Sequence, residues 1–282
     1  MDNKTAWDTL EKITNLPTLP AVYFQVNKLL QDKQASIEKI ARIIEVDPGM
    51  SSSILRLVNS AFYGLGKTCN SISHAVMILG FNAVKNAIVS VTVLDALTVK
   101  DRPAGFNTTD FWRHSVSVAV LARQLAQRSR LAAPEDAFIA GLLHDAGKII
   151  LLNYFKDDFL RILQAMRERN LAFADAEQEV ASLDHVQIGA YLARKWQMPD
   201  PIVEAIACHH YYVTQDDTTG LVECVIAANM LASSNYSVHP DDIIFEGRVE
   251  DALKPLLAAP ESWLPEAVEE IDAACEFFLE KR

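Results

Sequence analysis

The sequence predicts an all-α fold. Apolar residues recur at spacings of three and four along most segments, which is the period of an amphipathic helix. Ser, Thr, Asp, Pro and Gly stand where these segments would begin and end, as capping and stop residues do. The chain has 282 residues, 50% of them hydrophobic, which is enough for one large globular domain or two small ones.

The charge balance argues against two classes of partner. With 26 basic and 37 acidic residues the formal net charge is -11, so the global field repels phosphate backbones and anionic lipid. We therefore expect neither nucleic acid nor a membrane as a direct partner. The four cysteines show no CxxC spacing and indicate reduced thiols in a cytoplasmic protein. Residues 1–17 lack the profile of a secretory signal, which favours the same location.

The first helices are marked by their caps. Ser36 is placed to cap a helix whose apolar positions lie within residues 37–44. This helix is expected to stop at Asp47, because Pro48 and the glycine after it disfavour its continuation. Residues 51–64, SSSILRLVNSAFYG, predict a second short helix.

A longer apolar stretch follows. Residues 73–79 predict a helix that ends at Gly80, and a further helix runs from residue 81 to about residue 99. Its most apolar part, Ala87–Val99, is shorter than the ~20 residues that a membrane span requires. Asp95 interrupts it as well, so we expect a buried core helix.

The best internal boundary is KDRPAGFN, residues 100–107, where a Pro and a Gly lie inside a charged stretch. We therefore predict an N-terminal helical lobe in residues 1–105 and a second helical lobe in residues 106–238. Residues 239–282 are expected to form a tail of one or two acidic amphipathic helices.

Capping residues also mark the helices of the second lobe. Thr108 or Thr109 is expected to cap the helix that carries His114. Pro134, followed by two acidic residues, is expected to open the helix that ends in His144–Asp145.

Two later helices have similar starts. Asp184 is expected to cap the helix that begins at His185. Asp200, followed by a Pro, is expected as an N-cap, with Glu204 completing a capping box. That helix projects onward to His209–His210.

Five of the seven histidines thus recur at helix positions, together with one carboxylate. Imidazole and carboxylate ligands on rigid helix ends suit one or two divalent transition-metal ions such as Fe, Mn, Zn or Ni. A single histidine is more often a hydrogen-bonded core residue, but the joint placement favours a metal-compatible pocket, whether filled or empty. His74 and His239 lie outside the pattern and are interpreted as ordinary. The candidate ligands are His114, His144, Asp145, His185, His209 and His210.

This pattern resembles the HD superfamily of metal-dependent phosphohydrolases, which runs H, then HD, then a distant D, with extra histidines in two-metal members. Upstream, LPTLPAVYFQVNKLL, IARIIEVDPGMSSSILRLVNSAFYG and SISHAVMILGFNAVKNAI resemble the front half of the HD-related output domain, a bacterial signalling relative. Together the two stretches cover roughly residues 14–235. The resemblance implies a multi-helix HD-like bundle with an N-terminal helical lobe.

The resemblance also implies roles for these residues. His114, His144 and Asp145 would hold a first metal, and Asp145 would bridge to a second ion surrounded by His185, His209 and His210. Lys148 would meet a phosphate oxygen, so Asp145 and Lys148 would be the catalytic residues of an enzyme.

Two departures from the superfamily bear on activity. Asn229 stands where its last metal-binding Asp is expected, and an amide offers a neutral oxygen in place of a carboxylate. Metal affinity and catalysis should both be weaker as a result. Cyclic-dinucleotide phosphodiesterases of the superfamily show a Glu and a GYP run after the paired His, whereas HHYYVTQDDTTG, residues 209–220, stands here. That activity is not expected.

Three functions remain open. The output-domain resemblance implies a bacterial cytoplasmic signalling module that acts through contacts with a protein partner rather than turnover. The alternative is a metal-dependent phosphohydrolase acting on a nucleotide or another phosphoester. A third possibility is a pocket that binds a metal or nucleotide without hydrolysis and alters the packing between the lobes. The sequence shows no sensor or receiver domain, so the input is expected from a separate molecule or a ligand. The oligomeric state is left open.

Overall fold

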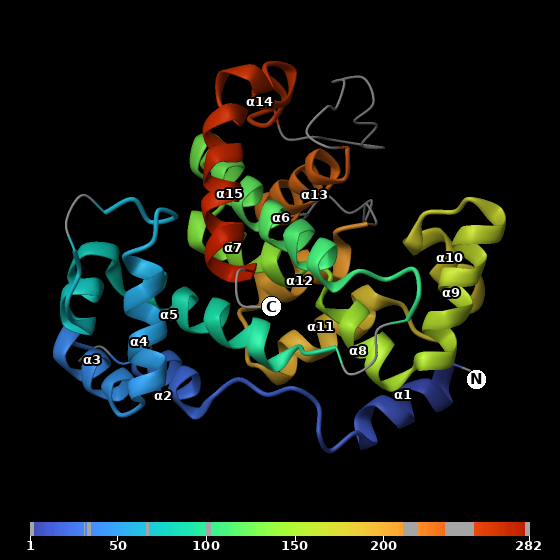
Figure 1. The fold of residues 1–282 in the computed structure, drawn as a ribbon, viewed down its shortest axis with the longest axis horizontal. Helices are drawn as coiled ribbons and strands as arrows, with labels where there is room; N and C mark the ends of the chain where they lie inside the picture. The colour runs from blue at the N-terminus through green and yellow to red at the C-terminus, as the bar shows by residue number, and fades with distance from the viewer. Residues whose placement is uncertain are drawn as a thin grey trace. The chain divides into compact units, whose positions relative to one another are not determined.

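The structure, a computed structural model, describes residues 3–30, 32, 35–65, 68–99, 103–210, 219–234 and 251–279. These residues form helices joined by turns, with no strand among them (Figure 1). The all-α prediction is therefore confirmed.

The chain divides into two compact units that do not follow the order of the sequence. The first unit holds Met1–Pro17 and Leu97–Ala259, and the second holds Thr18–Ala96 and Pro260–Arg282. The change of unit at residue 97 lies close to the boundary predicted in residues 100–107. The two terminal segments are grouped differently from the predicted division. Met1–Pro17 belong to the same unit as Leu97–Ala259, and Pro260–Arg282 belong to the same unit as Thr18–Ala96.

Helix caps in the second unit follow the sequence closely. The Ser36 side chain accepts a hydrogen bond from the Lys39 backbone N–H at 3.3 Å, as its capping role requires. Asp47 does more than end the preceding helix, because it caps the next one by accepting from the Met50 N–H at 3.0 Å. The helices of this unit are α2 (Ala21–Leu30), α3 (Ile37–Glu45), α4 (Pro48–Val58), α5 (Ile72–Ala96) and α15 (Leu264–Leu279).

Helix α5 contains the break that the sequence predicts. Gly80 has φ 83° and ψ 169°, a conformation that glycine tolerates and that no helix interior adopts. By length and composition alone α5 could cross a membrane, and Pro134–Tyr154 with Lys156–Arg169 would pass the same test as a span bent by 114°. Core helices share these properties, and α5 packs against α2, α3 and α4 within its own unit.

The C-terminal helix α15 completes the second unit. Phe278 meets Phe62 edge to face, with ring centroids 6.3 Å apart. The Arg56 guanidinium lies 5.9 Å from the ring centroid of the neighbouring Phe277. Part of the expected acidic tail is therefore built into the unit that holds α4. Residues 235–250 lie outside the described part of the chain.

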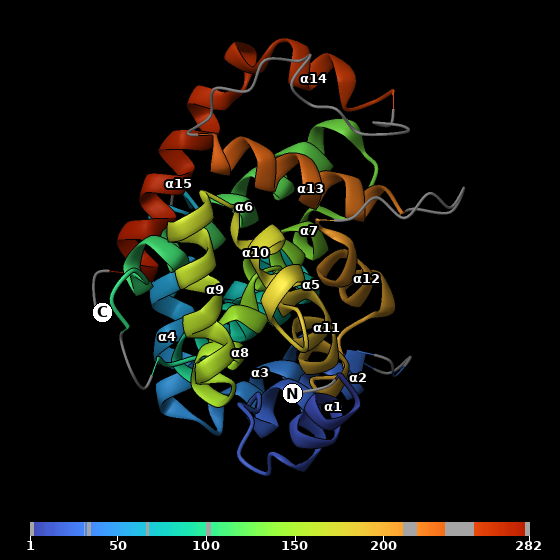
Figure 2. The ribbon, with the colours of Figure 1, turned by 90° about the vertical axis from the view of Figure 1, so that its right-hand side faces the viewer.

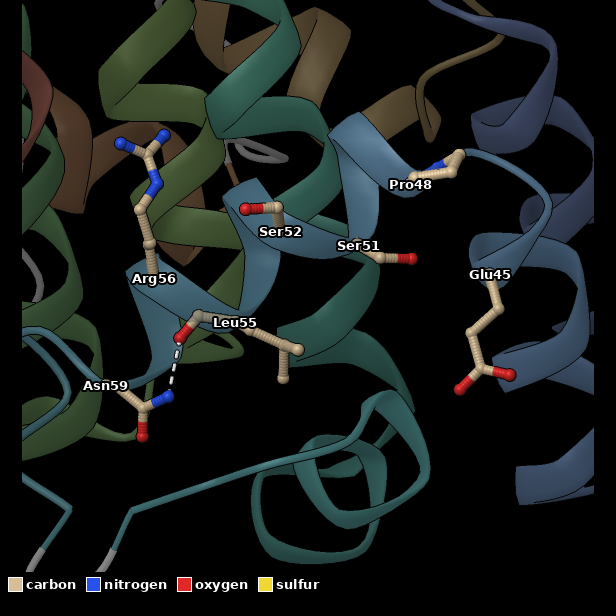
Figure 3. Close-up of a pocket in the computed structure, with 7 residues that line it drawn as sticks. All are labelled: Glu45, Pro48, Ser51, Ser52, Leu55, Arg56 and Asn59. Carbon is tan, nitrogen blue, oxygen red and sulfur yellow. Dashed lines mark hydrogen bonds between the residues drawn. The ribbon is translucent and has the colours of Figure 1, made fainter.

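The second unit carries a surface hollow of about 680 Å³ (Figure 3). Within it, Asn59 donates through Nδ2 to the Leu55 carbonyl at 2.8 Å (Figure 3), and its amide also pairs with the backbone N–H and carbonyl of Cys69, so it ties the helix end to the following loop. The lining offers one carboxylate and no imidazole or thiol, which does not suit a metal. The residues that line it are Glu45, Pro48, Ser51, Ser52, Leu55, Arg56 and Asn59.

The first unit is a helical bundle organised around α6. Helix α6 packs against α7 and α13, while α11 packs against both α8 and α12 (Figures 1 and 2). Its helices are α1 (Asn3–Lys12), α6 (Thr108–Ser129), α7 (Pro134–Leu143), α8 (Ala146–Tyr154), α9 (Lys156–Arg169), α10 (Phe173–Val180), α11 (His185–Lys195), α12 (Asp200–Cys208), α13 (Gly220–Ser233) and α14 (Lys254–Ala258).

Two helix starts in this unit agree with the sequence. Pro134 is the first residue of α7, where its missing N–H costs no helical hydrogen bond. Asp184 caps α11 by accepting from the Gln187 N–H at 2.7 Å, and the Gln187 side chain returns a bond to the Asp184 N–H.

Two other predicted caps are wrong. Asn107, rather than Thr108 or Thr109, caps α6, because its extended backbone lets Oδ1 accept from the Thr109 N–H at 2.9 Å. The capping box at Asp200 and Glu204 does not form, since Asp200 is already the first helical residue of α12. Pro199 holds the cap position there without a side-chain bond.

Close packing of α8 on α11 depends on one glycine. A Cβ at Gly147 would lie 1.9 Å from the His185 backbone oxygen, so no side chain fits. A Cβ at Gly189, on the facing helix, would first meet the Ile206 Cγ2 methyl at 3.0 Å. That methyl belongs to a side chain that can move, whereas the His185 carbonyl belongs to the backbone.

Gly147→Ala should therefore lower the free energy of unfolding by about 1–3 kcal/mol, the usual cost of overpacking. Gly189→Ala, the matched control, should cost less than about 1 kcal/mol because the nearby methyl can shift. Urea denaturation of both variants measures the difference. Equal destabilisation would show that Gly147 is not a special point of helix contact.

Candidate metal centre

The histidines and Asp145 converge on one site in the first unit. His144 ends α7 and Asp145 begins α8, so one tight junction presents both side chains. His185 opens α11 and His209 closes α12. Ligand atoms within each of two groups lie within 4.8 Å of one another, and Asp145 belongs to both. The groups are His114, His144 and Asp145, and Asp145, His185, His209 and His210.

The two carboxylate oxygens of Asp145 face different neighbours. Oδ1 lies 3.3 Å from Nε2 of His185 and 3.5 Å from Nε2 of His209. Oδ2 lies 3.4 Å from Nε2 of His144 and 3.9 Å from Nε2 of His114. Oδ2 also accepts a hydrogen bond from Nζ of Lys148 at 2.7 Å. Lys148, expected to meet phosphate, therefore pairs with the central carboxylate.

Hydrogen bonds at Nδ1 orient three of the rings. Nδ1 of His144 donates to the Gly141 carbonyl at 2.7 Å, and Nδ1 of His209 donates to the Ile206 carbonyl at 2.8 Å. Nδ1 of His185 lies 2.5 Å from Oε2 of Glu177 and donates to that carboxylate. A neutral ring protonated on Nδ1 keeps its lone pair on Nε2. Each Nε2 atom is thus presented toward Asp145.

Glu177 is a functional residue that sequence reasoning missed. Its side chain is 1% exposed, and its Oε1 accepts from the His185 backbone N–H at 2.7 Å while Oε2 accepts from the ring. Carboxylates that hold a ligating histidine in this way fix its tautomer and raise its basicity. The local sequence offers no cue, because Glu177 shares its short helix with Glu179, which pairs with Arg169 at the surface.

The donor set fits a divalent transition metal. Nε2 of His144 and Oδ1 of Asp145 are buried and have no hydrogen-bond partner. Buried polar atoms are normally paired, so two unpaired ligand atoms in one His/Asp cluster indicate a place for a cation. Imidazole and carboxylate ligands suit the ions expected from the sequence. A bound ion would supply Lewis acidity and positive charge at this point.

The pKa shifts reflect burial and crowding. Burial, reinforced by the charge of His144, lowers the pKa of His114 to about 4. Burial likewise lowers the pKa of His209 to about 3. Burial alone would also lower the pKa of His185, but the nearby carboxylates of Asp145 and Glu177 outweigh it and raise the pKa. For Asp145 burial opposes ionisation, yet nearby His144 and Lys148 hold the pKa well below its usual value.

Asn229 lies at the edge of the cluster. It is on α13, is 9% exposed, and its side chain hydrogen-bonds to His114. The amide therefore faces the group that contains His114 and His144 and contributes no charge there.

A hollow of about 580 Å³ opens onto the cluster. Lys148 is one of its lining residues, and Nζ of Lys148 lies 4.8 Å from the Phe173 ring centroid. Aromatic rings, an amide and a carboxylate surround the exposed face of His114. The lining consists of Gly105, Phe106, Asn107, Asp110, Phe111, His114, Asp145, Lys148 and Phe173.

Other residues considered from the sequence lie elsewhere. His74 belongs to the second unit and is half-buried in α5. His239 and residues 211–218, which include most of the stretch after the paired histidines, lie outside the described residues. The four cysteines are all described and form no disulfide.

Comparison with known proteins defines the family. The HDOD domain family matches residues 16–212, about 70% of the chain by its residue numbers. The chain belongs to the HDOD domain family. A crystal structure of an HDOD domain protein of unknown function from Geobacter sulfurreducens has a TM-score of 0.78 and 24% sequence identity. The match covers 98% of each chain and establishes the shared fold.

Two curated relatives match different lengths of this chain. An uncharacterized protein of Treponema pallidum (strain Nichols) is 26% identical over 228 residues, 80% of this chain and 44% of the relative. Ribonuclease Y of Lactobacillus gasseri is 33% identical over 130 residues, 46% of this chain and 18% of that enzyme. The chain thus spans less than half the length of these curated relatives.

Removing the Glu177 charge should weaken metal binding. We expect Glu177→Gln to raise the Kd for Zn²⁺ by about 10–100-fold, because His185 loses the carboxylate that orients it. Glu179→Gln, a change of the same kind at the exposed end of α10, should leave the Kd unchanged. Competition with a chromophoric chelator measures both constants. Equal affinity of the two variants would contradict a supporting role for Glu177.

The metal-free protein should lose stability between about pH 6.5 and pH 4. In this window the unfolded chain protonates His114 and His209, while the folded protein resists protonation until about pH 4 and about pH 3. His185 has the opposite pH dependence because its pKa is raised. Its contribution to the free energy of unfolding is fully present below pH 6.5 and is lost as the pH rises through the raised pKa. Asp145 adds a further loss of stability at pH values below 3.8, the usual pKa of its carboxyl group.

Urea unfolding followed by tryptophan fluorescence at several pH values tests this expectation. His209→Gln should reduce the decrease in unfolding free energy between about pH 6.5 and pH 4. His74→Gln, in the second unit, should leave that decrease unchanged. An unfolding free energy that stays constant from pH 7 to about pH 4 would contradict the shifted pKa values.

Proposed function

We propose that this chain is a regulatory HDOD module of the bacterial cytoplasm that binds a phosphorylated ligand or a signalling protein at the His/Asp cluster without turning it over. One observation carries the proposal. The cluster keeps oriented imidazoles around a buried carboxylate, but an amide, Asn229, faces His114 where a hydrolytic site would place a second carboxylate.

Several contacts support binding of an anionic ligand. Asp145 and the imidazoles around it can hold an ion, and an ion together with the Lys148 ammonium attracts phosphate oxygens. The adjacent hollow of about 580 Å³ lies in the usual size range of small-molecule sites. Phe106 and Phe173 line it and offer apolar ring faces to a nucleobase or a similar ring.

The same contacts argue against efficient turnover. Hydrolysis at a metal centre requires an ion that is held firmly and whose charge is balanced, so that it activates water and stabilises the transition state. A neutral Asn229 provides neither charge nor strong coordination. Ligand occupancy would then act by shifting the population of conformations that a partner recognises.

A phosphohydrolase is the second candidate. The remaining residues of the superfamily pattern are present and converge, and one relative is named Ribonuclease Y. The formal net charge of -11 disfavours a polynucleotide, so a small phosphoester would be the better substrate on this hypothesis.

Restoring the carboxylate separates the two functions. The full chain and Asn229→Asp would be assayed with Mn²⁺ or Zn²⁺ against a panel of nucleotides and other phosphoesters, with Asn229→Ala as the matched control. The unchanged protein should show no metal-dependent turnover and should bind phosphorylated ligands in calorimetry. Asn229→Asp should bind metal more tightly and gain measurable hydrolysis, because a second carboxylate returns to the cluster.

Two results would contradict the proposal. Turnover by the unchanged protein that disappears in His144→Ala would establish an enzyme. Failure to bind any phosphorylated ligand or signalling partner would remove the proposed regulatory role of the site.

A further inference from the structure

Asp145 divides the cluster into two chemically unlike halves. The Oδ1 half consists of His185, His209 and His210 around Oδ1 of Asp145. The Oδ2 half consists of His114, His144, Lys148 and Asn229 around Oδ2 or beside it.

The Oδ1 half has the spacing of a metal site. Nε2 of His185, Nε2 of His209 and Oδ1 of Asp145 form a triangle with sides of 3.3, 3.3 and 3.5 Å. Ligand atoms about 2.0–2.1 Å from a tetrahedral ion lie about 3.3–3.4 Å apart. The ligand atom of His210 lies within 4.8 Å of the other three.

The contacts of the Oδ1 half also suit a cation. Nδ1 of His185 bonds to Glu177 and Nδ1 of His209 donates to the Ile206 carbonyl, so both Nε2 atoms point into the same space, 3.3 Å apart. Oδ1 of Asp145 is buried without a hydrogen-bond partner beside them. The buried carboxylate of Glu177 adds negative charge behind His185.

The Oδ2 half already contains a positive group. The Lys148 ammonium lies 2.7 Å from Oδ2 and is held over the Phe173 ring at 4.8 Å. The ring nitrogens of His114 and His144 are farther from Oδ2, at 3.9 and 3.4 Å.

Charge decides between the halves. Nε2 of His144 is unpaired, so the Oδ2 half does offer a ligand for a second ion. An ion bound there would lie against an ammonium and would find the neutral amide of Asn229 instead of a carboxylate. Asp110 lines the hollow nearby but is exposed, so solvent screens its charge.

We propose that the cluster binds a single divalent transition-metal ion in the Oδ1 half and that the Lys148 ammonium occupies the place of a second ion at Oδ2. This inference deepens the proposed function and rests on it in assuming that the cluster binds metal. Lys148 is then a positioning residue. By occupying Oδ2 of Asp145 it leaves only Oδ1 for a metal ion and so limits the cluster to one ion.

Metal counting in matched lysine variants tests the inference. The metal-free full chain would be titrated with Mn²⁺, with free Mn²⁺ followed by electron paramagnetic resonance and bound metal by elemental analysis after gel filtration. The unchanged protein and Lys148→Arg, which keeps the charge, should bind one ion. Lys148→Met should bind two, with a coupled resonance signal expected for ions about 3.5–4 Å apart.

Histidine variants locate the ion. His210→Ala should weaken Mn²⁺ binding about tenfold or more, whereas His114→Ala should change the Kd by less than about threefold. Circular dichroism establishes whether each variant folds. If a histidine variant does not fold, the comparison of Lys148→Met with Lys148→Arg still decides the stoichiometry.

Four results would overturn the inference. The first three are two ions in the unchanged protein, only one ion in Lys148→Met, and an ion that is lost in His114→Ala but kept in His210→Ala. The fourth is no bound Mn²⁺ in any variant. In that case, continued binding of phosphorylated ligands or a partner would preserve the proposed function, and loss of that binding would remove both.

Discussion

The buried carboxylate of Asp145 is the constraint on which the first unit depends. Its side chain is 3% exposed, and a carboxylate in such surroundings is costly unless positive charge and hydrogen-bond donors compensate it. Lys148 supplies part of that compensation through the first turns of the same helix. The remaining oxygen, Oδ1, is buried without a hydrogen-bond partner and faces Nε2 of His185 and Nε2 of His209. This arrangement is what makes the cluster a candidate cation site.

The ends of helices provide the orientation of the rings. The last carbonyls of a helix have no partner within it, and at two helix ends a histidine ring takes up such a carbonyl. His144 bonds to the Gly141 carbonyl and His209 to the Ile206 carbonyl, each three residues back. His185 lies at a helix start, where free N–H groups replace free carbonyls. A carboxylate, Glu177, is needed there because it accepts from both the ring and the backbone N–H.

The proposed regulatory role and the proposed metal stoichiometry have a common cause in the distribution of charge. Positive charge from Lys148 and the neutral amide of Asn229 lie on the side of His114, while Glu177 lies on the side of His185. Such an arrangement can retain an ion and an anionic ligand while lacking the balanced pair of carboxylates that hydrolysis uses. On this proposal the hollow beside Lys148 would determine which ligand reaches the ion.

By itself the sequence determined the helical fold, the break at Gly80 and the set of candidate ligands, because periodicity, backbone restrictions and side-chain chemistry are local properties. The structure was needed to show that Asn107 rather than a threonine caps α6, and only the tertiary structure decided that α15 completes the second unit. It also decided the role of Glu177 and the pairing of Lys148 with Asp145. These features depend on which backbone and side-chain atoms approach in space, and such contacts leave no repeating pattern along the chain.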